Sequence, residues 1–280
     1  MVFNGNYTGF RSEDYFIWKL NKKRFNELDF NFQLFIEDLF PNIKPNDFIF
    51  CKKNEYPQKF DILVTINNLT KRFSLKKGYK NSVHSEGISS FIHFLIENDM
   101  PKELVIEFLK YHYADGTTNG KGTYRQSVEE YKINHKEEIK KINNFINQPE
   151  ILRKCIKRFI TKGNNSNIEI DALVYGVVHD FIWIKREDIY NLLLNREEES
   201  DSIHFGRLTY QPMDRCLNYN EKYENKRFIS QIKWYNIGDD IIEYMYNESL
   251  KNKELNDNSN IEYIKLNKNT NKDNFNIIYI

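Results

Sequence analysis

Four polar residues in the first third of the chain have the types that could bind a divalent cation and a phosphate: Asp61, Ser74, Lys76 and Glu86. Carboxylates bind hard divalent cations such as Mg²⁺, and an ammonium group can neutralise charge on a phosphate. An isolated charge beside short apolar segments is costly unless it has a partner. We therefore expect a divalent cation and a phosphate to supply those partners.

A β-hairpin is expected to position three of these residues. The run 60–66 is short and rich in β-branched residues, an Asn-Asn pair interrupts it, and the run 71–77 alternates along its length. This pattern is typical of two strands joined by a tight turn. Alternation places Ser74 and Lys76 on one face, and strand pairing brings Asp61 beside them.

An aspartate followed by a hairpin with a Ser-x-Lys tripeptide resembles the motif of the PD-(D/E)xK nuclease superfamily, which includes many restriction endonucleases. Two positions depart from the commonest pattern: Phe60 stands where proline often precedes the aspartate, and Ser74 stands where an acid is usual. Some members with serine there recruit a glutamate from the following helix. Glu86 lies in the segment 82–94, which is expected to be helical. The resemblance covers residues 25–98.

The resemblance implies an α+β (α/β) fold, with a restriction-endonuclease-like mixed sheet in αβββαβ order flanked by helices. It also implies a metal-dependent endonuclease that hydrolyses DNA phosphodiester bonds. Asp61, Glu86 and the backbone carbonyl of Leu75 would hold Mg²⁺ together with the scissile phosphate. Lys76 would orient the attacking water, and Ser74 would donate a hydrogen bond to a metal-bound water. An upstream helix often carries a further acid in this fold, for which the candidates are Glu27 and Glu37.

A second group of polar residues, mostly in the later half of the chain, has the types that read base edges. Arginine binds guanine and Asn or Gln binds adenine through paired hydrogen bonds. We therefore interpret these residues as a target-recognition surface on double-stranded DNA. The alternative is an ordinary α+β region whose arginines form ion pairs. The candidates for DNA binding are Asn81, at an expected helix entrance, and Arg207, Gln211, Arg215, Asn218, Arg227 and Lys233.

Composition restricts the other classes of protein. The 41 basic and 40 acidic residues give a net charge of +1, so no overall basic field attracts nucleic acid non-specifically. The three cysteines contain no C-x-x-C pair, which disfavours a structural zinc site and a disulfide framework. No apolar stretch has the length of a membrane span, and the first residues lack the pattern of a secretory signal. We therefore expect a cytoplasmic protein that does not associate with a membrane.

Three regions are expected along the chain: a nuclease-like core over 1–125, a helical and α+β region for target recognition over 126–250, and a polar linker and tail over 251–280. Helices are expected over 12–20, 28–39, 83–97, 102–112, 127–147, 151–158, 187–194 and 239–250. Strands are expected over 48–51, 60–66, 72–76, 159–162, 169–175, 180–184, 203–205, 208–211, 227–234, 261–266 and 275–280.

Two further classes of function are open. One is a non-catalytic nucleic-acid-binding protein on the same fold, in which Ser74 marks a decayed active site. The other is a protein-interaction module, which the near-neutral charge and the many Tyr and Phe residues favour. For a nuclease that cuts both DNA strands we expect a homodimer, because two strands need two active sites related by a twofold axis.

Overall fold

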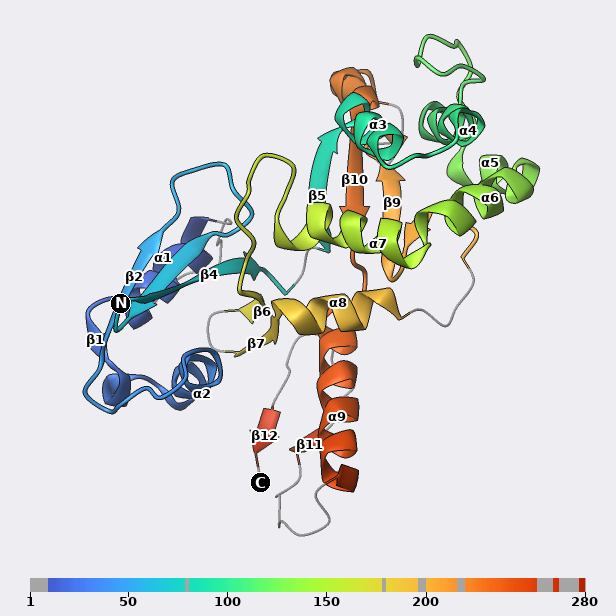
Figure 1. Ribbon diagram of the computed structural model, residues 1–280. Helices are drawn as coiled ribbons and strands as arrows, with labels where there is room; N and C mark the ends of the chain where they lie inside the picture. Colours follow the sequence, from blue (N-terminus) through green and yellow to red (C-terminus); the bar gives the residue numbers. More distant parts are fainter. Residues whose placement is uncertain are drawn as a thin grey trace.

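Two main β-sheets organise the chain, and helices flank both of them (Figure 1). The computed structural model describes residues 10–78, 81–177, 180–195, 200–215, 220–255, 264–266 and 277–279. The fold is mixed α+β, as the sequence predicted. In Figure 1 the sheets form two lobes, and helix α8 (Arg186–Leu194) runs below the second lobe from the junction between them.

The first sheet has six strands in the order β1-β2-β3-β4-β6-β7. Strands β2, β3 and β4 form an antiparallel meander, β6 is parallel to β4, and β7 is antiparallel to β6. The turn between β3 and β4 is the predicted Asn67-Asn68 pair, and both residues have positive φ, as a tight hairpin turn requires. The strands are β1 (Lys23–Arg24), β2 (Phe48–Lys53), β3 (Ile62–Ile66), β4 (Leu69–Lys76), β6 (Ala172–Val177) and β7 (Asp180–Lys185).

Helices α1 (Phe10–Leu20) and α2 (Phe30–Leu39), joined through the short η1 (Phe25–Glu27), cover one face of this sheet. Their apolar residues pack on inward-facing strand residues in an aromatic core. Phe35 of α2 is completely buried there, with its ring 5.1 Å from that of Phe73 on β4. Because side chains alternate along a strand, Ser74 and Lys76 point to the opposite face.

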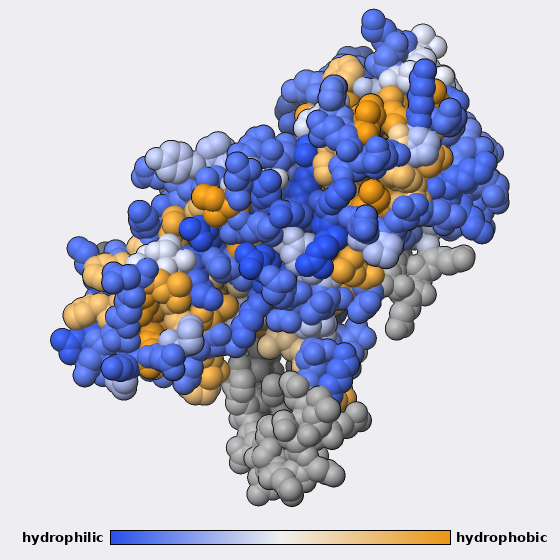
Figure 2. Space-filling view, in the orientation of Figure 1, coloured by the Kyte–Doolittle hydropathy of each residue, from blue (hydrophilic) through white to orange (hydrophobic). Residues whose placement is uncertain are grey.

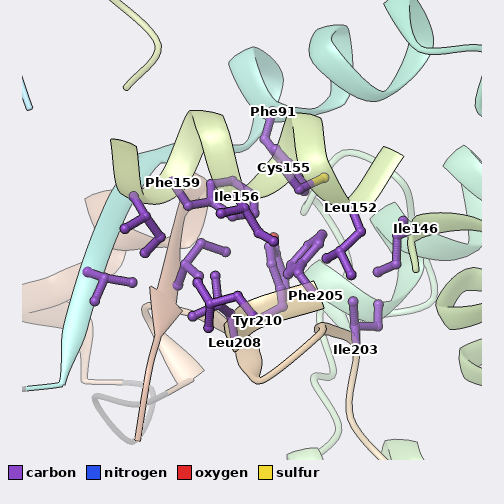
Figure 3. Close-up of a cluster of buried hydrophobic side chains, with 14 of the residues drawn as sticks. Phe91, Ile146, Leu152, Cys155, Ile156, Phe159, Ile203, Phe205, Leu208 and Tyr210 are labelled. Atoms are coloured by element: carbon purple, nitrogen blue, oxygen red, sulfur yellow. The ribbon is translucent and has the colours of Figure 1, made fainter. Parts of the chain in front are cut away.

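The second sheet is antiparallel, with four strands in the order β5-β10-β9-β8. Figure 3 shows how residues of helix α7 (Pro149–Ile156), such as Leu152 and Cys155, lie against Phe205 and Tyr210 of this sheet. The strands are β5 (Ser82–Gly87), β8 (His204–Phe205), β9 (Leu208–Pro212) and β10 (Ile229–Lys233). The remaining helices are α3 (Ile88–Glu97), α4 (Lys102–Tyr113), α5 (Val128–Asn134), α6 (Lys136–Ile146), α7 (Pro149–Ile156), η2 (Lys157–Thr161), η4 (Glu221–Phe228) and α9 (Ile237–Leu255).

Three expected elements differ in the structure. The segment expected to be one helix over 83–97 starts as strand β5, because residues 82–87 pair with β10 far along the chain, and helix α3 begins only at Ile88. The expected strand 159–162 is instead the π-helical turn η2, which continues α7. The expected helix 127–147 breaks at His135 into α5 and α6.

Each of the two main sheets contains strands that precede residue 125 and strands that follow it. Strands β6 and β7 complete the first sheet, and β5 belongs to the second. In the tail, β11 (Ile264–Leu266) pairs with β12 (Ile277–Tyr279), and the rest of the two expected tail strands lies outside the described residues. No helix in the described part of the chain combines the length and apolarity needed to cross a membrane.

Candidate functional site

The aspartate of the hairpin lies beside the serine, as the strand pattern predicted. Asp61 directly precedes β3, and its backbone N–H donates to the Phe73 carbonyl of β4 at 2.8 Å. Its Oδ2 accepts a hydrogen bond from the Leu75 backbone N–H at 2.6 Å and from the Ser74 hydroxyl at 3.3 Å. No described residue donates to Oδ1 of Asp61, so this oxygen remains available to a ligand.

Lys76 lies two residues after Ser74 on the same face of β4. It pairs with Tyr175 of the parallel strand β6, and among the described residues none forms a hydrogen bond or ion pair with its ammonium group. A half-buried lysine without a carboxylate partner is suited to an anionic ligand.

The glutamate of the motif is held differently from the expectation. Glu86 lies on β5 and is buried. Arg158 donates to both of its carboxylate oxygens, at 2.9 and 2.6 Å, and the His84 ring nitrogen Nε2 lies 3.0 Å from Oε1. Burial on its own would raise the pKa of Glu86, but the hydrogen bonds from Arg158 and His84 lower it to about 2. Glu86 is therefore ionised near neutral pH, and both of its carboxylate oxygens are engaged.

The upstream acids do not join Asp61. Glu27 accepts a hydrogen bond from the Arg24 backbone N–H at 2.8 Å, at the start of η1. Glu37 is exposed on α2, which packs on the face of the sheet opposite to Ser74. In the described parts of the chain, no group of three or more His, Cys, Asp or Glu residues is placed to hold a metal ion. Only Asp61 of the expected acids keeps a carboxylate oxygen suited to a metal at this site.

The sequence did not single out Lys59, although it lies only two positions before Asp61. Its Nζ donates to the Val83 carbonyl of β5 at 2.8 Å and lies 3.4 Å from Nδ1 of His84. Burial, and then the nearby charge of Lys76, lower the pKa of Lys59 to about 7, against the opposing effects of Asp61 and Glu86. Lys59 thus connects the hairpin of the first sheet to β5 of the second.

His84 is neutral in this arrangement. Burial lowers its pKa below the ordinary value, although the hydrogen bond with Glu86 acts in the opposite direction. A neutral ring that donates from Nε2–H to the Glu86 carboxylate has its lone pair on Nδ1, which then accepts from the Lys59 ammonium. Arg158, Glu86, His84 and Lys59 therefore form a continuous chain of hydrogen bonds.

A pocket of about 270 Å³ opens beside this chain, and we call it the Lys59 pocket. It lies between the loop that precedes Asp61, the strand β5, and the turn that follows η2. Figure 2 shows that hydrophilic side chains predominate on the viewed face between the two lobes. The residues that line the pocket are Pro57, Gln58, Lys59, Val83, His84, Ser85, Lys162, Gly163, Asn164, Asn165 and Ser166.

The three arginines expected to bind DNA all form contacts within the protein. Arg207 forms an ion pair with Asp240 at 2.7 Å. Arg215 is buried and donates to a backbone carbonyl of α4 at 2.5 Å. Arg227 donates to the Gly120 carbonyl at 2.6 Å and forms an ion pair with Glu224, within its own helix η4, at 3.0 Å. These contacts favour the alternative in which the arginines serve the fold.

The other DNA-binding candidates lie at scattered places. Asn81 precedes strand β5 rather than a helix, and its carbonyl accepts from the Trp234 backbone N–H at 2.8 Å. Gln211 lies on β9, and Lys233 on β10 places its ammonium 5.6 Å from the ring centre of Tyr235. Asn218 lies outside the described residues.

The geometry of Asp61, Ser74 and Lys76 carries the functional argument. No protein-family model and no curated protein sequence matches this chain. We therefore argue function from the chemistry of these side chains and from the order of the strands that hold them.

Proposed function

We propose that this protein is an endonuclease that hydrolyses DNA phosphodiester bonds, with Asp61 and Lys76 as its catalytic residues. The observation that carries this proposal is the placement of Asp61 directly before β3, held by Ser74 and by the Leu75 N–H of β4. Lys76 follows two residues after Ser74 on the same face of β4 and is unpaired among the described residues. The first sheet and α2 follow the chain order α2, β2, β3, β4 and β6, and the long connection from β4 to β6 contains strand β5 and helices α3 to α7. This order supports the αβββαβ core of the nuclease superfamily that the motif resembles.

The protein's own groups have distinct roles in this reaction. The Leu75 N–H and the Ser74 hydroxyl hold Oδ2 of Asp61, which fixes the carboxylate and leaves Oδ1 for a ligand. The Lys76 ammonium offsets negative charge that develops on the phosphoryl oxygens, or orients the water that attacks phosphorus. Glu86 stays with Arg158 and has no contact with the reacting phosphate in this proposal.

A metal ion fits this site only with a smaller ligand set than the resemblance implies. Mg²⁺ commonly binds through one or two carboxylates, substrate phosphates and several waters. Asp61 would hold such an ion, and the bound ion would supply a Lewis acid to the phosphate. Since the two oxygens of Glu86 are engaged by Arg158 and His84, we do not include Glu86 as a ligand.

A second candidate is a DNA-binding protein without catalysis, and the pairing of Glu86 with Arg158 favours it. A site that has Ser74 in place of an acid and a neutralised Glu86 retains a single carboxylate. Such a protein would bind DNA with no requirement for Mg²⁺. Both candidates share the same phosphate-facing lysine.

Cleavage of supercoiled plasmid in the presence of Mg²⁺ distinguishes the two candidates. The informative variants are Asp61→Asn and Lys76→Met. Lys71→Met is the matched control, because Lys71 lies on the same strand but on the other face, near the Phe40 ring. We expect Lys76→Met to lower the cleavage rate at least about 100-fold, as does loss of a group that stabilises transition-state charge. Lys71→Met should cleave like the wild type.

The products report further on the mechanism. A restriction-type homodimer would convert the plasmid to the linear form in one binding event, whereas a monomer would release nicked circles first. A wild type that binds plasmid without cutting it, over a range of divalent cations and DNA sequences, would establish the non-catalytic candidate and refute the nuclease.

A further inference from the structure

The Lys59 pocket has walls of one charge sign. Lys59 and Lys162 supply ammonium groups, His84 supplies a neutral ring, and the remaining polar groups are amides and hydroxyls. No carboxylate is among the residues that line it. A concave site with two basic groups and several neutral donors suits an oxyanion.

Lys59 has a donor left for a ligand. An ammonium group carries three N–H bonds. One points to the Val83 carbonyl at 2.8 Å and a second to Nδ1 of His84 at 3.4 Å. The third is available in the pocket that Lys59 lines. Since Glu86 orients His84, the buried Glu86 acts here as a positioning residue for Lys59.

Positive charge exceeds negative charge around the pocket. Arg158 offsets the charge of Glu86, and Asp61 is the other carboxylate whose charge acts on Lys59. A dianion in the pocket would offset this excess positive charge. The basic groups are Lys59, Lys76 and Lys162.

The turn above Lys59 has a backbone suited to this arrangement. Gly163 has a φ of +83°, a conformation that glycine adopts without strain. A Cβ atom at this position would lie 3.8 Å from Cδ of Lys59, so the turn passes directly over the lysine stem. The side chains of Asn164, Asn165 and Ser166 follow immediately and complete the rim.

We propose that the Lys59 pocket binds a phosphate group of the nucleic-acid strand, next to the phosphate on which Asp61 and Lys76 act, with Lys59 and Lys162 as its ligands. The assignment of this phosphate to a nucleic-acid strand rests on the proposed function. The preference of the pocket for a doubly charged oxyanion is independent of that function.

Sulfate binding is the direct readout. In protein labelled with ¹³C-lysine, the Cε signal of Lys59 is identified by its loss in Lys59→Met, and its chemical shift is followed by NMR as sulfate is added at constant pH. Sulfate is the first probe, because it has the shape and charge of a phosphate dianion. Chloride at equal ionic strength controls for screening. We expect the Lys59 signal to shift to saturation with sulfate and to stay unchanged with chloride.

Variants locate the effect in the pocket. Lys162→Gln should weaken sulfate binding about tenfold or more, since it removes one of two charge-assisted contacts. Lys140→Gln, at an exposed position on α6, is the matched loss of one positive charge and should behave like the wild type. A Lys59 signal that does not respond to sulfate, or that responds equally in Lys162→Gln and Lys140→Gln, overturns the proposal.

A duplex oligonucleotide, added without Mg²⁺, tests whether the phosphate belongs to DNA. A saturating shift of the Lys59 signal with both sulfate and duplex supports the proposal, whereas a response to sulfate alone assigns the pocket to free phosphate and overturns the strand assignment. This titration does not require cleavage. A protein that shows the response to DNA but never cuts it keeps this site and loses the proposed hydrolysis.

Discussion

Arg158 donates two parallel hydrogen bonds to the Glu86 carboxylate, from Nε at 2.9 Å and from Nη2 at 2.6 Å. The pair joins the π-helical turn η2 to strand β5, and the side chains are only 14% and 3% exposed. Arg158 also donates to Ser90 of α3, and its guanidinium lies 4.7 Å from the ring centre of Phe94. The glutamate expected to be a metal ligand therefore fastens three elements together.

We expect Glu86→Gln to lower the free energy of unfolding by about 3 kcal/mol, because loss of one partner leaves the other charge buried and unpaired. Urea denaturation measures this change. Asp29→Asn, which breaks an ion pair whose aspartate side chain is 60% exposed, is the control and should cost at most about 1 kcal/mol. Equal effects of the two substitutions would show that Glu86 is not a structural anchor.

The same pair makes stability depend on acid. The pKa of Glu86 is about 2 in the folded protein and 4.5 ordinarily, so the unfolded chain binds the proton more tightly. Its contribution to stability is therefore complete above pH 4.5 and is lost as the pH falls towards 2, by at most about 1.4 kcal/mol per pH unit. Urea unfolding between pH 2 and 6 should show a shallower loss in Glu86→Gln than in the wild type.

His112 adds a second acid-dependent contribution at higher pH. Its Nε2–H donates to the Arg227 carbonyl at 2.8 Å, and Nδ1 accepts from the Tyr210 hydroxyl at 2.7 Å, which requires a neutral ring. Burial lowers the pKa of His112 to about 3, from 6.5. Stability should therefore fall with pH between 6.5 and 3, and this dependence should weaken in His112→Asn.

The control for His112 is His93→Asn, at an exposed position on α3. Its profile of unfolding free energy against pH should match that of the wild type. An unchanged slope in His112→Asn would mean that another group causes the acid sensitivity over this interval.

Ser74→Ala tests whether the serine of the motif is structural or chemical. The hydroxyl is completely buried and forms a long hydrogen bond of 3.3 Å to Asp61. We expect a loss of stability of about 1 kcal/mol and plasmid cleavage within about tenfold of the wild type, because the Leu75 N–H still holds the carboxylate. Cleavage as low as in Asp61→Asn would give Ser74 a direct role in the reaction.

The hairpin that carries Asp61, Ser74 and Lys76 could be predicted because its signals are local. Period-2 alternation, β-branched residues and the Asn-Asn turn all lie within sixteen residues, 61–76, and the structure confirms the pairing. Strand β5 could not be predicted in the same way. Its six residues are strand only because β10 pairs with them, and Ile88 then starts a helix that the apolar spacing did predict.

The partners of Glu86 depend on the tertiary fold. Arg158 lies 72 positions away, at the end of the expected helix 151–158, and the chain continues there as the turn η2 where a strand was expected over 159–162. Lys59 lies only two residues before the motif, so its position could be read from the sequence. Its lowered pKa could not, because that arises from burial against β5. A buried charge cannot be recognised in a sequence until the element that buries it has been placed.

The interleaving of the two sheets bears on how the protein is made. Arg72 of β4 bonds Asp171, 99 positions later, and Ser85 of β5 bonds Ser230, 145 positions later. During synthesis, β4 and β5 leave the ribosome well before β6 and β10. Until their partner strands are made, β4 and β5 each keep an unpaired edge that can form hydrogen bonds with another chain. Contacts this distant in sequence also form slowly. The nascent chain is therefore exposed to aggregation until translation is nearly finished, and slower synthesis at low temperature should raise the yield of folded protein.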